Sequence, residues 1–189
     1  TTGLDWLRDR VFGVSICTPE GESFYWDLRK TPSALAWLQS EIPRAQLIIC
    51  HNAKFDWHMS RQMGIFFPED RVDCTLVRSA LIDEHLGNYG LDFLSSKYLG
   101  EGKEDIVDDL FAIFGGKNTR QAQMINLSLA PFDLVARYAK RDAELTLKLW
   151  EFQNHEIHTQ DLAQVARIEK QLLPVLVEME RLGVRIDAD

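Results

Sequence analysis

A short, uninterrupted apolar run at residues 46–50 (QLIIC) limits the possible folds more strongly than any other segment of this sequence. A run of this length without polar alternation is typical of a strand that is buried on both faces. The polar stretch CHNAKFD at residues 50–56 follows it directly. We therefore expect an α/β fold in which polar side chains gather beyond the carboxyl end of this strand, where such folds place ligands and catalytic groups.

The rest of the chain predicts strands first and helices afterwards. Residues 11–17 and 22–28 have strand composition and are separated by TPEG, which predicts an antiparallel hairpin. Thr31 and Pro32 predict the start of a helix, and Pro43 predicts its end. This order favours a mixed sheet flanked by helices.

From Asp73 onward, the apolar spacing predicts helices almost throughout, apart from a polar loop at residues 115–120 (GGKNTR). We expect the remaining helices at residues 53–63, 73–82, 91–99, 130–154 and 162–182. There is no internal repeat that would indicate a solenoid.

Composition excludes several classes of protein. With 21 Lys and Arg against 29 Asp and Glu, the formal net charge is −8, which argues against nucleic-acid binding through a broad basic face. Nucleic acid held through bound metal cations is still compatible with this charge. The 3 cysteines have no CxxC spacing, so we expect reduced thiols in a cytoplasmic protein. No apolar run approaches the roughly 20 residues that a membrane span needs.

Two polar motifs lie where chemistry is expected. His51, Asn52 and Asp56 follow the buried strand. Tyr138 and Asp142 are four residues apart in a predicted helix, so they share one face about one turn apart. An aspartate inside a helix is unfavourable by propensity, which suggests a function for Asp142.

In this order, the two motifs resemble the 3′–5′ proofreading exonuclease domain of family A DNA polymerases, a DEDD exonuclease with a ribonuclease H-like fold. Asn52, Phe55 and Asp56 match the family's second motif, Asn-x2-3-Phe/Tyr-Asp. Tyr138 and Asp142 match the third, Tyr-x3-Asp, which places the chain in the Tyr subclass. The resemblance covers nearly the whole chain. It implies an exonuclease domain at residues 1–158 and the start of the polymerase domain, or a linker helix leading toward it, at residues 159–189.

The family's first motif, Asp-x-Glu on the first strand, is the one departure from the resemblance. The family sequence usually continues after it with a stretch like TTGL, and this sequence begins at Thr1 with those letters. Only two of the four family carboxylates are therefore in the sequence. The resemblance places the first strand inside the sheet, between residues 11–17 and 46–50, where its loss would leave backbone groups unpaired at about 1–3 kcal/mol each. We expect the natural polypeptide to continue upstream.

The resemblance also implies the chemistry of the site. Two divalent cations, Mg²⁺ or Mn²⁺, are expected, with Asp56 as a ligand of the outer ion and Asp142 as a ligand of the inner one. Tyr138 is expected to orient the attacking water. Leu4 is expected to wedge against the terminal base, while Asn52 and Phe55 contact the substrate. This substrate would be the single-stranded 3′ end of DNA, in a bacterium or a phage-infected host cell.

Two alternatives stay open at this level. One is a catalytically silent exonuclease-like module that braces a polymerase, although the presence of Asp56, Tyr138 and Asp142 favours an enzyme. The other is a ribonuclease D-type RNA exonuclease. The C-terminal sequence LLPVLVEMERLGVRID favours a polymerase over this alternative. His155 and His158 lack zinc-ligand companions and are expected on a solvated face. The helical spacing turns Glu144 away from Asp142, which excludes it as a metal ligand.

Overall fold

The computed structural model of the chain describes residues 1–102 and 105–185. The four strands are β1 (Gly13–Cys17), β2 (Ser23–Asp27), β3 (Ile48–Cys50) and β4 (Val72–Cys74). The helices are α1 (Pro32–Glu41), α2 (Ala53–Gln62), α3 (Thr75–Ile82), α4 (Leu91–Leu99), α5 (Val107–Phe114), α6 (Arg120–Met124), α7 (Phe132–Thr159) and α8 (Ala163–Leu182), with 3₁₀ turns η1 (Ile42–Arg44) and η2 (Leu127–Leu129). None of the described helices is both long and apolar enough to cross a membrane.

The strands form two pairs of opposite kind. β1 and β2 are antiparallel, with Gly13 opposite Asp27, and the expected hairpin is confirmed. β3 and β4 are parallel, with Ile48 opposite Val72. The mixture of directions fits the expected mixed sheet, but in the described residues the two pairs are not hydrogen-bonded to each other. The edges of β1 and β3 that do not face β2 and β4 therefore have no strand partner among them.

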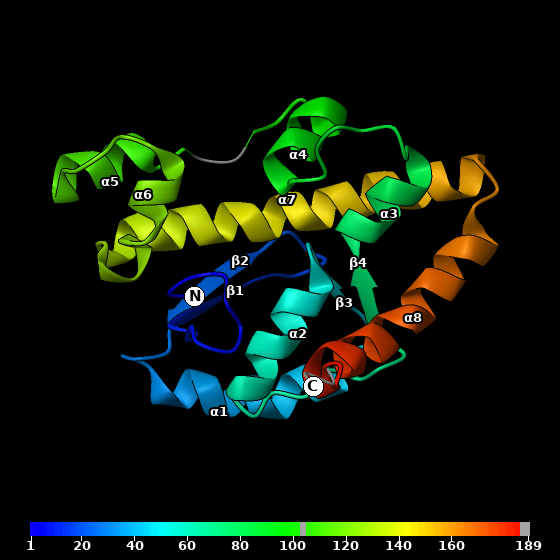
Figure 1. Cartoon of the computed structure of the whole chain (residues 1–189), viewed down its shortest axis with the longest axis horizontal. Coiled ribbons are helices and arrows are strands. Elements are labelled where there is room, and N and C mark those ends of the chain that lie inside the picture. The colour runs from blue at the N-terminus through cyan, green and yellow to red at the C-terminus, as the bar shows by residue number, and fades with distance from the viewer. Residues whose placement is uncertain (103–104, 186–189) are drawn as a thin grey trace, which may run out of the picture.

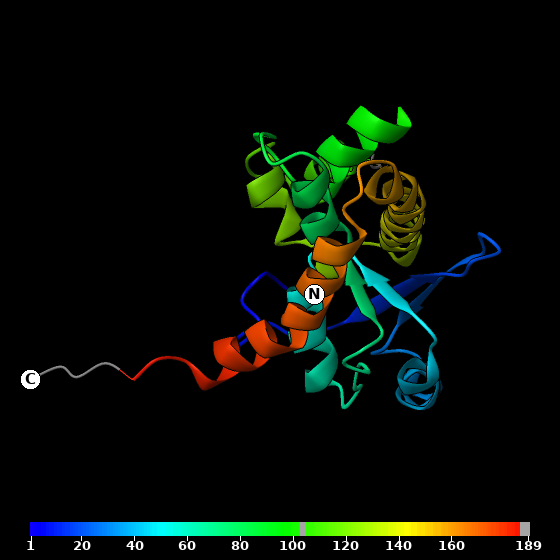
Figure 2. The ribbon, with the colours of Figure 1, turned by 90° about the vertical axis from the view of Figure 1, so that its right-hand side faces the viewer.

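The long helix α7 organises the molecule. Figure 1 shows it crossing the strands along the length of the protein, with α2 and α8 on the opposite side of the strands. Figure 2 shows the C-terminal part of α8 projecting away from the body. Three apolar clusters join the helices to one another and to the strands: Leu91, Leu94, Leu145 and Leu149 between α4 and α7; Ile106, Leu110, Leu134 and Tyr138 around α5 and α7; and Ala53, Trp57, Val72, Cys74, Leu173 and Val177 beneath α8.

The structure corrects the prediction for the segment that begins at Asp73. Residues 72–74 form β4, and the helix starts at Thr75, two residues later than predicted. The three-residue strand is too short for a periodic pattern and is defined by its pairing with β3. The structure differs from the prediction in two smaller ways. Residues 107–114 and 120–124 form two separate helices, and α7 continues to Thr159 rather than ending at residue 154.

A cavity of about 900 Å³ lies between the two strand pairs. Its lining includes every residue of β1 and of β3, and residues of α2 and α7. The cavity therefore lies between the hairpin and the parallel pair, where the middle of the expected mixed sheet would be.

Candidate active site

Asp56 reaches the cavity because β3 turns abruptly into α2. Asn52 makes this turn in the left-handed region, at φ 64° and ψ 56°, which asparagine tolerates better than most residues. Asp56 then lies in the first turn of α2 and lines the cavity together with Asn52 and Phe55. The amino end of a helix is a favourable place for a carboxylate, since the backbone N–H groups there carry partial positive charge.

Burial dominates the electrostatics of Asp56. It raises the pKa of the carboxyl to about 7, although a hydrogen bond with Cys50 acts in the opposite direction. Burial also raises the pKa of the Cys50 thiol well above its usual value, so this neighbour is a neutral thiol at pH 7. A carboxylate in such surroundings gains strongly from a nearby cation, since its charge is otherwise poorly solvated.

Tyr138 and Asp142 enter the same cavity from α7. The ring of Tyr138 is buried against Ile106, Leu110 and Leu134, and its hydroxyl accepts a hydrogen bond from Nη2 of Arg120 at 3.0 Å. Asp142 follows one turn later and is half-buried. The two motifs, far apart in the sequence, thus line one cavity.

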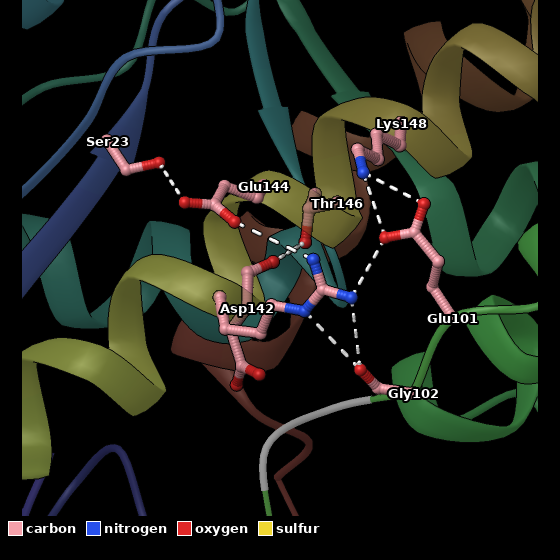
Figure 3. Close-up of polar contacts among 8 residues, drawn as sticks. Ser23, Glu101, Gly102, Asp142, Glu144, Thr146 and Lys148 are labelled. Atoms are coloured by element: carbon pink, nitrogen blue, oxygen red, sulfur yellow. Dashed lines mark hydrogen bonds and ion pairs between the residues drawn. The ribbon is translucent and has the colours of Figure 1, made fainter.

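Polar contacts fix the segment of α7 that carries Asp142. Arg141 donates to Oε2 of Glu101 at 2.8 Å, and Lys148 donates to both carboxylate oxygens of Glu101 at 2.8 and 2.9 Å. Oε1 of Glu144 accepts from Ser23 in β2 at 2.6 Å. Figure 3 shows the carboxylate of Asp142 pointing away from Glu144, as the helical spacing predicts. These contacts hold α7 between the hairpin and the segment that follows α4.

Leu4 is the predicted site residue that the structure does not bring into the cavity. Leu4 is 85% exposed and lies in an N-terminal turn. This turn is closed by hydrogen bonds that join Thr2 to Asp9 and Arg10. The wedge role of Leu4 therefore stays a prediction. Sequence reasoning missed Arg120, whose contact with Tyr138 depends on the fold of a polar segment that was interpreted as a loop.

The carboxylates at the cavity are suitable ligands for a hard divalent cation, but they do not form a complete metal site. Asp56 and Asp142 supply carboxylate oxygens from two sides of one cavity, which are donors of the type that Mg²⁺ and Mn²⁺ prefer. Within residues 1–102 and 105–185, however, no group of three or more His, Cys, Asp or Glu side chains is arranged to hold a metal ion.

Comparison with known families decides the classification. Residues 1–158 match the model of the 3′–5′ exonuclease of family A DNA polymerases. The chain belongs to this family. The metal dependence that the family implies agrees with the two carboxylates at the cavity.

Individual relatives agree with this classification. The chain is 51% identical over 189 residues to DNA polymerase DpoZ of Acinetobacter phage SH-Ab 15497, covering 99% of this chain and 30% of that protein. It is 32% identical over 158 residues to DNA polymerase I of Rhizobium leguminosarum, covering 82% of this chain and 14% of that protein. The chain thus spans less than a third of the length of these polymerases.

A solved structure supports the fold. Brucella melitensis NrnC bound to pGG matches with a TM-score of 0.65 at 21% identity, covering 100% of this chain and 85% of that chain. At this identity the likeness bears on the fold alone. Together with the family match, it confirms the expected ribonuclease H-like α/β class.

Proposed function

We propose that this chain is the 3′–5′ proofreading exonuclease unit of a family A DNA polymerase, which hydrolyses the terminal phosphodiester at the single-stranded 3′ end of DNA. The observation that carries the proposal is the common cavity of Asp56, Tyr138 and Asp142. Two segments that are distant in the sequence deliver two carboxylates and a phenol to the lining of one cavity. A structural role alone does not explain two carboxylates in such surroundings, because each costs free energy to bury.

Each residue has a defined part in this reaction. Asp56 and Asp142 would hold two divalent cations, Mg²⁺ or Mn²⁺, which supply an activated water and stabilise the leaving 3′-oxygen when bound. Tyr138 orients the water through its hydroxyl. Asn52 and Phe55 line the same cavity and contact the terminal nucleotide.

The cavity between β1 and β3 supports a second part of the proposal. A β-strand that runs between them would hydrogen-bond to both unpaired edges and join the two pairs into one mixed sheet. We assign this position to a segment of the natural polypeptide that carries Asp-x-Glu. Such a strand would bring two further carboxylates to Asp56 and Asp142 and complete the ligand set for two cations.

The partner in the same polypeptide would be a polymerase domain that follows the exonuclease unit at residues 1–158. The exposed face of α8 offers it a packing surface, with apolar residues at alternating spacings of four and three: Ile168, Leu172, Val175, Met179 and Leu182. Such a stripe is typical of a helix that packs against a second helix. The opposite face of α8 packs in the core through Leu173 and Val177. Residues 159–185 would therefore join the two domains. Residues 186–189, the end of the predicted linker, lie outside the described residues. A polymerase of this kind would act in the cytoplasm of a bacterium or of an infected host cell.

The test is digestion of 3′-labelled single strands by the complete natural polypeptide and its Asp142→Ala variant. We expect Mg²⁺- or Mn²⁺-dependent shortening of DNA, faster than that of RNA, and its loss on chelation and in the variant. The melting temperature of the variant without metal should be unchanged or higher, since clustered carboxylates repel. Glu151→Ala, on an exposed position of the same helix, is the matched control and should digest normally.

Each alternative function has its own result in this assay. Digestion that persists in Asp142→Ala would contradict the proposed site. Complete inactivity of the natural polypeptide with every metal would favour a silent module that braces a polymerase. Faster digestion of RNA than of DNA would favour an RNA-processing exonuclease.

A further inference from the structure

The N-terminal turn, residues 1–10, is closed by its own hydrogen bonds. The carboxylate of Asp9 accepts from the hydroxyl of Thr2 at 2.9 Å and from the backbone N–H of Asp5 at 2.8 Å. Gly3 leaves the space that this carboxylate occupies, since a Cβ atom at Gly3 would lie 2.4 Å from Oδ2 of Asp9. The turn is therefore braced from inside and keeps its own shape.

Trp6 fastens this turn to two helices. Its ring stacks on the ring of His58 in α2, with centroids 4.0 Å apart and planes 10° apart. The guanidinium carbon of Arg181 in α8 lies 5.9 Å from the centre of the indole ring, which is a cation–π contact. The backbone carbonyl of Trp6 accepts from Nε2 of Gln62, the last residue of α2. The turn is thus held through both the ring and the backbone of one residue.

The support beneath Trp6 is itself fixed. His58 is buried, and its Nε2 lies 2.8 Å from Oε2 of Glu180 in α8. The other carboxylate oxygen of Glu180 accepts from Nζ of Lys54 in α2, so one carboxylate joins the two helices. His58 follows Asp56 by two residues on α2. The stack of Trp6 on His58 therefore sets the position of the turn relative to a carboxylate of the candidate active site.

The anchored turn presents apolar side chains beside the cavity. Thr1, where the turn starts, lines the cavity, and three residues span at most about 11 Å, so Leu4 lies near its rim. Leu4 and Leu7 are both largely exposed on either side of Trp6. An exposed apolar side chain gains free energy when an apolar surface covers it, and the face of a nucleobase is such a surface.

We infer that Trp6 is a positioning residue, which holds the N-terminal turn so that Leu4 packs against the terminal base of the DNA strand. This inference rests on the proposed function. A turn that is already fixed loses little conformational freedom when DNA binds, whereas an unanchored turn has to be ordered at each binding event. Loss of the anchor should therefore weaken the binding of DNA and leave the chemical step at the carboxylates nearly unchanged.

A double-mutant cycle in the complete natural polypeptide tests the inference. Trp6→Ala removes the anchor, and Leu4→Ala removes the side chain that the anchor presents. On single-stranded DNA with Mg²⁺, we expect Trp6→Ala to raise KM about tenfold with kcat within about threefold. In the Leu4→Ala background, which should itself have a raised KM, Trp6→Ala should change KM by less than about twofold.

Three further variants sharpen the cycle. Trp6→Phe keeps a ring on His58, so its KM should stay within about threefold of the natural value. Gln62→Ala removes the hydrogen bond to the Trp6 carbonyl at an exposed position and should raise KM about threefold. Trp37→Ala is the matched control: Trp37 is a half-exposed tryptophan on α1 that packs against Trp26, and its loss should leave KM within about twofold.

The outcomes separate this inference from the proposed function. An unchanged KM in Trp6→Ala would overturn the inference, and so would equal rises of KM with Trp6→Ala in both backgrounds, because Trp6 would then act independently of Leu4. If Trp6→Ala does not fold, Gln62→Ala decides by the same two criteria. Digestion that persists in Asp142→Ala would instead overturn the proposed function itself, whatever the Trp6 variants do.

Discussion

Nη1 of Arg78 lies 2.8 Å from Oδ2 of Asp73, and this ion pair closes the junction between β4 and α3. The same carboxylate oxygen accepts from Nε1 of Trp150 in α7 at 2.9 Å, and Oδ1 accepts from the backbone N–H of Cys74. Both charged side chains are close to 10% exposed. Burial lowers the pKa of Arg78, and Asp73 opposes that shift. One carboxylate therefore ties together a strand and two helices.

Asp73→Ala should destabilise the protein by about 3–5 kcal/mol, because it leaves the Arg78 cation buried without its carboxylate partner. Urea unfolding followed by tryptophan fluorescence measures this loss. The double variant Asp73→Ala/Arg78→Met removes the stranded charge and should be more stable than Asp73→Ala alone. A single-variant loss below about 1 kcal/mol would show that the pair does not hold this junction.

Asp27 should make stability depend on pH. Arg29 donates to it from Nε and Nη2 at 2.9 and 2.8 Å, and this side-chain hydrogen bonding holds the pKa of Asp27 below its usual value although burial opposes it. A lowered folded pKa stabilises the protein above the unfolded pKa near 4, and the contribution is lost as the pH falls through the folded value.

The variant Asp27→Asn isolates this contribution. It should lower the free energy of unfolding at pH 7 by about 1–2 kcal/mol, since a hydrogen bond to a charged group is lost. The difference from the natural protein should shrink as the pH falls below about 4 and should vanish once the pH is below the lowered pKa of Asp27 in the folded protein. Urea midpoints across this range measure it, and a difference that does not change with pH would contradict the assignment.

Two valines on α8 provide a matched pair for the packing of that helix. Val177 is fully buried in the cluster with Trp57 and Val72, whereas Val175 is 51% exposed in the apolar stripe. Val177→Ala should cost about 2 kcal/mol through lost burial and a residual cavity. Val175→Ala should stay within about 0.5 kcal/mol in the chain of residues 1–189 by itself. Equal costs would mean that α8 is not packed as described.

The gap between β1 and β3 predicts a gain of stability on adding a strand. A chain extended upstream of Thr1 by about ten residues, enough for one strand, should melt at a higher temperature than residues 1–189. It should also digest single-stranded DNA with Mg²⁺, while the shorter chain should not, because two carboxylates do not hold two cations against water. Parallel thermal melts and digestion assays measure both. Equal digestion by the two chains would show that Asp56 and Asp142 have other partners.

Local patterns predicted much of the fold because the relevant forces act between neighbours in the sequence. The helix at Leu91–Leu99 ends at Gly100, as its spacing and terminal glycine indicate, and Gly100 takes the left-handed conformation with φ 67°. The hairpin of β1 and β2 follows from strand composition and a turn. Spacing alone also placed Tyr138 and Asp142 on one face of a helix, and the short motif led to Asp56.

Tertiary structure decided the features that depend on contacts between distant segments. Residues 72–74 are a strand only because β3 lies beside them, and no pattern of three residues carries that information. Arg120 meets Tyr138 only because a buried Gln123 folds the polar loop back onto α6. The sequence by itself thus determined the helices, the hairpin and the carboxylates, through spacing and local conformation. The pairing of β3 with β4, the common cavity of Asp56 and Asp142, and the partner of Tyr138 were decided by packing, since their free energy comes from groups that the chain brings together only on folding.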